Sequence, residues 1–350
     1  MNIKEFSRHL NLSIATVSRA LNNSTEVSTA TRRKVLEEAQ RLGYSANAAG
    51  RNLRKGKAET IALLLPSDNQ DNFYTASFFM KISRRLQQVL LEHSMDMVLH
   101  MAQDVREEQV WLTKVISQRK ADAVILTDTL VHDSRISFLQ QHHFPFVTLG
   151  RSETLAGAFN WVDMDFSQMA DTATTQAIAK GYRHIALVTL GRDSMQGKCF
   201  VDSYRQCLQR HGLPVREDII FQGDIGEQTG YLSMDHFLSL SERPDYVIFI
   251  NDIQIVGAYH RLRCQGLDPE RDIAMNCGVV SSDVSSFLTP APTGFVVNHA
   301  ELGEVLAHSV LHAIKCCEPP MQTLVSLTRN DTLSHEPVMA MPQSTDYPKR

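Results

Sequence analysis

Two series of apolar segments, separated by stretches long enough for helices, place the strongest constraint on the fold of this chain. The first series is "TIALLLP", "DMVLHM", "DAVILT" and "PFVTLG", and the second is "HIALVTL", "DYVIFI" and "DIAMN". Segments that are apolar throughout predict strands buried on both faces, and intervening helices favour parallel sheets. We therefore expect two α/β subdomains after about residue 60.

Polar and aromatic residues follow several of these expected strands. In open parallel sheets a ligand lies beyond the carboxyl ends of the strands, so two facing subdomains predict a cleft between them. Carboxylates and amides beside aromatic rings suit a polyhydroxylated ligand. Each residue by itself could equally be a strand-end or helix-capping group. The residues are Asp68, Asn69, Phe73, Tyr74, Thr127, Asp128, Gly150, Arg151, Asn251 and Asp252.

The charge is distributed unevenly along the chain. Residues 1–57 contain eleven Lys and Arg against four Asp and Glu, a net charge of +7, whereas the whole chain carries −4. A basic head on an acidic body is expected where one end meets a polyanion, although a solvated basic face would give the same count.

The first 43 residues predict three short helices. Ile3, Phe6 and Leu10 share one helical face. Asn11 suits a left-handed turn, and Ser13 can cap a second helix. The expected core of the second helix is Val17, Ala20 and Leu21.

A third helix is expected between Ser28, as its cap, and Gly43, as its terminator, with Val27 packing before the cap. Its expected apolar face is Val35, Leu36, Ala39 and Leu42. Three such helices are typical of a helix-turn-helix domain, and a plain helical mini-core is the alternative.

The segment "NIKEFSRHLNLSIATVSRALNNSTEVSTATRRKVLEEAQRLGYSANAAGRNL" resembles the DNA-binding head of the LacI/GalR family of transcriptional regulators, through TVSR-x-L-N, TR-x-x-V and LGY. The resemblance implies that residues 13–22 form a recognition helix in the major groove. The expected DNA-contacting residues are Ile3, Ser13, Ile14, Ala15, Thr16, Ser18, Arg19, Asn22, Ser28, Tyr44, Asn47, Gly50, Leu53 and Arg54.

Side-chain chemistry predicts what the recognition helix can read. The guanidinium of Arg19 matches O6 and N7 of guanine. Ile14 and Ala15 can only pack, most naturally on thymine methyl groups. We expect a half-site in which one G·C pair lies beside A·T pairs.

The stretch "YSANAAGRNLRKGKAET" corresponds in the resembled family to a hinge helix that forms when two copies meet in the minor groove. The resemblance implies that Leu53 wedges into the central base step, with Arg54 and neighbouring cations near phosphates. Gly50 stands where the resembled family commonly has alanine, and a glycine there is expected to weaken the hinge helix when the protein is not bound to DNA. We expect Gly50→Ala to tighten operator binding or to weaken induction.

From Ile61 to about Pro337 the chain is similar to the effector domain of the same family, which itself resembles periplasmic sugar-binding proteins. The quoted segments are "PFVTLGR", "WVDMDF", "KGYRHIALVT", "FIND" and "AELG". Phe200 stands where many relatives have a ligand-gripping arginine. The expected effector-binding residues are Phe73, Asp128, Arg151, Asp165, Phe200, Asn251 and Asp252.

Enzymatic alternatives find less support. "GRDSMQGKC" follows a strand as a phosphate-binding loop does, but its glycine spacing is wrong and Cys199 replaces the hydroxyl that binds magnesium. Asp163 with Asp165, and His142 with His143, have no spaced partner sets for acid-base or metal chemistry. An architectural DNA-packaging role would not need a large pocketed body.

The sequence therefore predicts an all-α helix-turn-helix head joined by a hinge helix to a two-subdomain α/β, periplasmic-binding-protein-like core with parallel sheets. The expected boundaries are 1–44 (head), 45–59 (hinge and linker), 60–337 (effector-binding and dimerisation) and 338–350 (tail). We expect a cytoplasmic homodimeric repressor of a carbohydrate-utilisation operon. It should bind double-stranded operator DNA and a small-molecule effector, have no cofactor, metal or enzymatic activity, and make no membrane contact.

Overall fold

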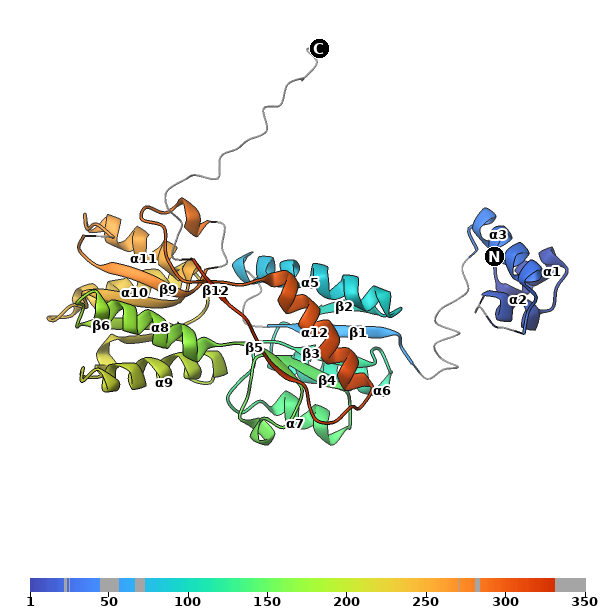
Figure 1. Cartoon of the computed structure of the whole chain (residues 1–350), viewed down its shortest axis with the longest axis horizontal. Coiled ribbons are helices and arrows are strands. Elements are labelled where there is room, and N and C mark those ends of the chain that lie inside the picture. Colours follow the sequence, from blue (N-terminus) through green and yellow to red (C-terminus); the bar gives the residue numbers. More distant parts are fainter. Residues whose placement is uncertain are drawn as a thin grey trace, which may run out of the picture. The chain divides into compact units, whose positions relative to one another are not determined.

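The computed structural model describes residues 1–21, 24, 26–44, 57–66, 73–269, 271–280 and 284–330. The chain separates into two compact units, Met1–Ala58 and Glu59–Arg350 (Figure 1). Several residues with expected roles lie outside the described residues: Asn22, Asn47, Gly50, Leu53, Arg54, Asp68 and Asn69.

The described residues of the first unit form three helices around a small core, as the sequence predicts. They are α1 (Ile3–Leu10), α2 (Ile14–Leu21) and α3 (Thr29–Arg41). The Phe6 ring is fully buried and stacks on Tyr44 with the ring centroids 4.2 Å apart. The buried core residues are Phe6, Leu10, Val17, Ala20, Val27, Val35 and Ala39.

Local signals set the ends of these helices. Asn11 lies in the left-handed region, with φ 54° and ψ 41°, and it ends α1 as predicted. The hydroxyl of Ser13 accepts a hydrogen bond from the Thr16 N–H at 3.0 Å. The hydroxyl of Ser28 does the same for the Thr31 N–H at 3.2 Å, and these two caps confirm the predicted helix starts.

The predicted core of the third helix was partly wrong. Val35 and Ala39 are buried, but Leu36 and Leu42 are 46% and 37% exposed. Positions four apart share a helical face, so the face that carries Val35 and Ala39 leaves Leu36 on the outer side. Three turns of helix therefore bury only a narrow stripe against α1 and α2.

The second unit contains two six-stranded sheets. In the first sheet every neighbouring pair is parallel, and the order is β2-β1-β3-β4-β5-β11. Its strands are β1 (Thr60–Leu65), β2 (Asp96–Met101), β3 (Ala123–Leu126), β4 (Phe146–Leu149), β5 (Trp161–Met164) and β11 (Gln322–Val325). The helices that flank it are α5 (Phe73–Glu92), α6 (Val105–Ser117), α7 (Ser134–Gln141) and α12 (His299–Ile314).

The second sheet repeats this order as β7-β6-β8-β9-β10, and β12 pairs antiparallel with β10. Its strands are β6 (Ile185–Leu190), β7 (Ile220–Gly223), β8 (Tyr246–Asn251), β9 (Ala274–Val280), β10 (Phe295–Val296) and β12 (Thr328–Arg329). Its helices are α8 (Phe166–Ala179), α9 (Met195–Arg210), α10 (Glu227–Ser239) and α11 (Asp252–Cys264). Three 3₁₀ turns are η1 (Thr154–Gly157), η2 (Glu217–Ile219) and η3 (Ser285–Phe287).

Helices cover both faces of the two sheets. Alternate residues of a strand point to opposite faces, so each face packs its own set of side chains against helices. In β1, Ile61 and Leu63 pack in the cluster that contains α5 and α12, whereas Ala62 and Leu64 pack with α6 and α7. The predicted two α/β subdomains with parallel sheets are therefore confirmed.

The strand β2 departs from its expected burial. We predicted a buried strand over "DMVLHM", but Val98, Leu99 and Met101 are 52%, 40% and 65% exposed. The strand lies at the edge of its sheet and pairs with β1 on one side. Its apolar side chains consequently form an exposed surface.

The chain passes three times between the two sheets: after β5, after β10 and after β11 (Figure 1). Helix α12 follows β10 in sequence but packs on α5, and Arg85 donates two hydrogen bonds to Glu304 between these helices. Each subdomain is therefore built from separate parts of the chain. Among the residues that the structure describes, no helix is both long and apolar enough to cross a membrane.

Candidate functional site

A cleft lies between the carboxyl ends of the two sheets, with about 740 Å³ of empty space that includes open solvent at its mouth. The residues that line it follow or end strands of both sheets, or lie at the starts of α5, α8 and α9. This is where open parallel sheets bind ligands, and it agrees with the position predicted from the sequence. The lining residues are Pro66, Tyr74, Thr75, Phe78, Phe79, Asp128, Leu149, Asp163, Met164, Phe166, Leu190, Gln196, Ile225, Ile250, Asn251 and Val279.

The lining combines aromatic faces with a few polar groups. Helix α5 contributes Tyr74 and Phe78, which are four residues apart on one helical face. Asp128 and Asp163 contribute carboxylates from the first subdomain, and Asn251 contributes an amide from the second. None of the described lining residues is a lysine or an arginine. The cleft therefore suits a ligand that has an apolar face and hydrogen-bond donors.

A buried ion pair lies beside the cleft. Nε of Arg151 donates to Oδ2 of Asp163 at 2.8 Å, and the side chain of Asp163 is only 4% exposed. Burial raises the pKa of the Asp163 carboxyl, although the neighbouring Arg151 acts in the opposite direction. The second oxygen, Oδ1, accepts the Met164 N–H at 2.8 Å. Asp163 is thus held rigidly where β5 ends.

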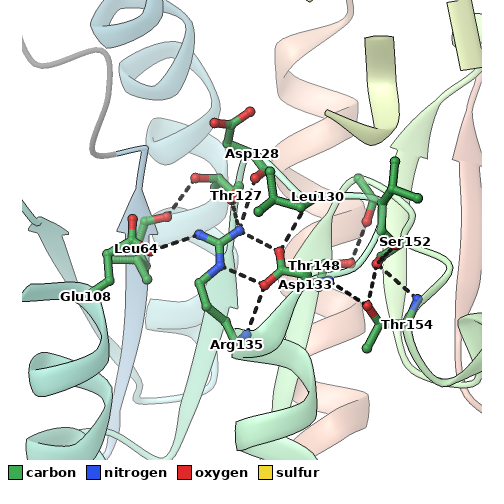
Figure 2. A network of polar contacts seen from close by, with 12 residues as sticks. Leu64, Glu108, Thr127, Asp128, Leu130, Asp133, Arg135, Thr148, Ser152 and Thr154 are labelled. Atoms are coloured by element: carbon green, nitrogen blue, oxygen red, sulfur yellow. Dashed lines mark hydrogen bonds and ion pairs between the residues drawn. The ribbon is translucent and has the colours of Figure 1, made fainter. Parts of the chain in front are cut away.

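A second polar network supports the loop that carries Asp128 (Figure 2). Arg135 donates from Nε and Nη2 to the two carboxylate oxygens of Asp133, at 3.0 and 2.7 Å. Nη1 reaches Glu108 at 3.4 Å, and Nη2 also binds the carbonyl oxygens of Thr127 and Asp128 at 3.1 and 3.0 Å. Arg135 is 8% exposed, so these contacts are shielded from water.

The structure brings only some of the predicted effector residues to the cleft. Asp128 and Asn251 line it, and Arg151 adjoins it through Asp163. Asp165 instead caps α8 by accepting the Gln168 N–H at 3.0 Å. Of Phe73, only its place as the first residue of α5 is described.

The other two predicted effector residues are buried away from the lining. Phe200 is 0% exposed in the core of the second subdomain, so the aromatic side chain fills the core instead of facing a ligand. Asp252 is also 0% exposed, and its carboxylate accepts the Ser285 hydroxyl at 2.5 Å. In the described conformation both residues therefore serve packing and loop attachment.

Sequence reasoning did not select several lining residues. Phe78 and Phe79 occur in an apolar helix whose rings are equally compatible with a core. Gln196 lies in the segment rejected as a phosphate-binding loop. The available signal was position, because each of these residues lies in the first two turns of a helix that follows an expected strand.

The outer face of α2 presents the side chains expected to meet DNA. Ser13, Ile14, Ala15 and Arg19 are exposed, and Ile14 is 44% exposed although it is aliphatic. Nε of Arg19 forms an ion pair with Oε2 of Glu26 at 2.9 Å. This helical face is free of core packing and has the composition of a groove-reading surface.

The other predicted DNA contacts that the structure describes are part-buried or take part in capping within the head. Ile3 and Tyr44 are half-buried against its core. The hydroxyls of Ser13 and Thr16 lie 2.8 Å apart, and Ser28 caps α3. Ser18 is half-buried on α2.

A small three-helix head with an exposed reading helix, joined in one chain to a two-subdomain body with a ligand-sized cleft, defines a ligand-responsive DNA-binding regulator. Residues 2–47 match the family model of bacterial regulatory proteins of the lacI family. Residues 58–328 match the model of periplasmic binding proteins and the sugar binding domain of the LacI family. The chain belongs to the LacI family of transcriptional regulators, as its sequence patterns imply.

Characterised relatives agree with this assignment. The chain is 30% identical over 267 residues to the HTH-type transcriptional regulator RafR of Escherichia coli, covering 76% of this chain and 77% of the relative. It is 26% identical over 307 residues to catabolite control protein A of Priestia megaterium, covering 87% and 90%.

Solved structures share the fold. The lac repressor dimer bound to operator and the anti-inducer ONPF matches with a TM-score of 0.82 at 18% identity, over 94% of this chain and 97% of that one. The complex of the transcriptional regulator CelR with cellobiose matches with a TM-score of 0.71 at 24% identity, over 94% and 98%.

Proposed function

We propose that this protein is an operator-binding repressor of carbohydrate-utilisation genes, and that a neutral polyhydroxylated molecule in the cleft controls its DNA affinity. The observation that carries the proposal is the cleft lining, in which aromatic side chains of α5 occur together with the carboxylates of Asp128 and Asp163. Two related proteins are named for such ligands: the ribose operon repressor of Escherichia coli and the CelR complex with cellobiose.

The charges in the cleft favour a neutral effector over a phosphorylated one. A phosphate group requires cations or converging N–H donors. The described lining provides two carboxylates, and the nearby Arg151 is already paired with Asp163. Carboxylates accept hydrogen bonds from sugar hydroxyls, whereas an apolar ring face packs on Tyr74 or Phe78.

We propose that the regulator acts as a twofold dimer in the cytoplasm. One head reads one half-site, so a symmetric dimer matches a pseudo-palindromic operator. The exposed apolar side chains of the edge strand β2 and of α5 support a partner surface on the first subdomain. These are Val98, Leu99, Met101, Met80 and Leu91.

On DNA, the proposed contacts are those expected from the sequence. Arg19 reads guanine, and Ile14 and Ala15 pack on thymine methyl groups. Gly50, Leu53 and Arg54 belong to the hinge, and their role remains a proposal of the sequence and of the family resemblance. We also propose that the protein performs no catalysis, so that its effector leaves chemically unchanged.

The test combines ligand screening with DNA binding. Thermal unfolding of the full chain is followed with ribose, cellobiose, other neutral mono- and disaccharides, and sugar phosphates, because a ligand of the native state raises the melting temperature. A neutral saccharide should stabilise the protein, change the retardation of a selected palindromic duplex, and be recovered intact. Stabilisation by sugar phosphates alone, or turnover of the saccharide, would refute the proposal.

A further inference from the structure

Two loops from opposite subdomains join at one side of the cleft. The Met195 N–H, at the start of α9, donates to the carbonyl oxygen of Thr129 at 3.1 Å, and the Val131 N–H donates to the carbonyl oxygen of Asp193 at 2.8 Å. These bonds flank a bridge between Leu130 and Ser194. Lys198 adds an ion pair with Glu153 at 3.2 Å. We call residues 128–131 the bridging segment.

The bridging segment also carries a cleft wall. Its first residue, Asp128, lines the cleft and has a φ of 51°, in the left-handed region that is costly for residues other than glycine. The next residue, Thr129, provides the carbonyl oxygen that crosses to Met195. One short segment therefore holds a ligand-facing carboxylate and the link to the other subdomain.

Arg135 fixes the main chain of the bridging segment through hydrogen bonds. Its guanidinium binds the carbonyl oxygens of Thr127 and Asp128 and both oxygens of Asp133, and Asp133 in turn accepts the Leu130 N–H at 3.3 Å. Figure 2 shows the Asp128 carboxylate extending away from the guanidinium while its main chain is held. The strained turn at Asp128 is thus held by a buried cation.

Close packing reinforces the same turn. A Cβ atom added to Gly150, which has a φ of 119°, would lie 2.3 Å from the hydroxyl oxygen of Thr129. The end of β4 therefore leaves room for Thr129 only because residue 150 has no side chain.

We propose that Arg135 is a positioning residue that couples effector binding to closure of the two subdomains, through the bridging segment. With Arg135 in place, Asp128 faces the cleft and Thr129 and Val131 join the opposite subdomain. Without it, both features are lost together. The coupling rests on the proposed function, because that function assigns the cleft to an effector. The bridge between the subdomains does not depend on that assignment.

The first test replaces Arg135 by lysine, which keeps the charge but cannot bind two carboxylate oxygens and two carbonyls at once. Hydrogen exchange of the full chain, without ligand, should rise about tenfold or more at the Val131 amide, since a lost charge-assisted bond is worth about that factor. The Val124 amide, which donates to the carbonyl oxygen of Pro145 inside the sheet, should be unchanged. A crystal structure of this variant should show Asp128 outside the left-handed region.

The second test opens the bridge from the other side. Met195 is the first residue of α9, where proline fits, and the preceding Ser194 has the extended ψ of 126° that proline requires. Met195→Pro deletes the N–H that crosses to Thr129, and Met195→Ala controls for the lost side chain. Val105→Pro is the matched control, because Val105 is the exposed first residue of α6 after the extended Asp104.

Met195→Pro should raise exchange at Val131 about tenfold, while Met195→Ala and Val105→Pro should not. In the double variant Met195→Pro with Arg135→Lys, exchange at the Val131 amide should rise less than about threefold above that of Met195→Pro alone, because both changes act on one segment. Unchanged Val131 exchange in either folded variant, or full additivity, would overturn the coupling. These measurements use no effector, so their failure is distinct from a failure of the saccharide screen.

Discussion

Nε of Arg19 lies 2.9 Å from Oε2 of Glu26, so the side chain expected to read DNA is already bound to a carboxylate in the free head. Both side chains are more than half exposed, and such pairs are weak in water. The pair engages Nε and holds the guanidinium in one orientation beside a carboxylate, whereas reading guanine needs two guanidinium N–H groups directed at the base edge. Glu26 therefore competes with guanine for Arg19.

Removing this competition should strengthen binding. We expect Glu26→Gln to tighten operator binding severalfold at low salt, because it frees Arg19 and removes a negative charge near phosphates. Arg19→Ala should reduce discrimination at one G·C pair by about 1–3 kcal/mol. Mobility-shift titrations on the selected operator and on a duplex with that pair exchanged measure both effects. If Arg19→Ala retains full discrimination, Arg19 does not read that pair.

Glu38 should make the head sensitive to acid. Hydrogen bonds from Arg41 and then His9 lower the pKa of Glu38 from 4.5 to about 2. A carboxyl whose pKa is lower in the folded state stabilises that state above its unfolded pKa and loses this effect as the pH falls toward 2. The pKa of Glu38, measured by carbon-detected NMR titration, should lie well below 4.5.

Arg41→Ala is the matching test, since it removes the largest cause of the Glu38 shift while leaving His9 in place. The pKa of Glu38 should then rise toward 4.5. The pKa of Glu38 in the wild-type protein should also rise at high salt concentration, because the side chains of Arg41 and Glu38 reach solvent and their attraction is screened. A Glu38 titration near 4.5 in the wild-type head would contradict the predicted pairing.

Loss of Arg151 should destabilise the body. Arg151→Ala leaves Asp163 buried without its counterion, which should cost about 3 kcal/mol in the free energy of unfolding by urea. Burial already raises the pKa of Asp163, and an acid whose pKa is raised on folding favours the folded state as the pH falls. The deficit should therefore be smaller at pH 4.5 than at pH 7, and Asp163→Asn in the same chain should reduce it. A deficit independent of pH would show that Asp163 stays protonated or solvated.

The contact between α10 and α11 should not tolerate a methyl group. A Cβ atom on Gly230 would lie 1.7 Å from the carbonyl oxygen of Gln254. Gly230→Ala should thus lower the free energy of unfolding by about 1–3 kcal/mol or more. Gly191→Ala is the control, because a Cβ there meets nothing within 4 Å. Equal stability of the two variants would indicate that the helices separate easily.

The seven apolar segments correctly predicted seven of the parallel strands, and continuous burial gave most of them a strong hydrophobic signal, with the exposed β2 as the exception. Strands outside the series include the short, mostly buried β5 and others that are short or half-exposed. β7 has no fully buried residue, and β10 and β12 have two residues each. They exist because a neighbouring strand offers a pairing edge, which single-segment hydrophobicity does not record.

The ends of the expected strands predicted the position of the cleft well, but they predicted the identity of its lining residues less well. Asp128 follows the buried strand β3 and Asn251 ends the buried strand β8, so topology alone brings them to the lining. At the family position of a gripping arginine this chain carries the aromatic ring of Phe200, and the ring is buried in the core. The role of Arg135 depends on its bonds to the carbonyl oxygens of Thr127 and Asp128, and these main-chain contacts leave no mark in the pattern of side chains.

The passage of the chain back to the first sheet also sets an order of events during synthesis. β11 pairs with β5, Gln322 opposite Trp161, so the ribosome must synthesise every strand of the second sheet except β12 before the first sheet receives its last strand. At about 5–20 residues per second, this delay lasts on the order of ten to thirty seconds. Until then β5 presents an open edge in the nascent chain, and any message truncated before codon 322 would leave that edge permanently exposed to aggregation.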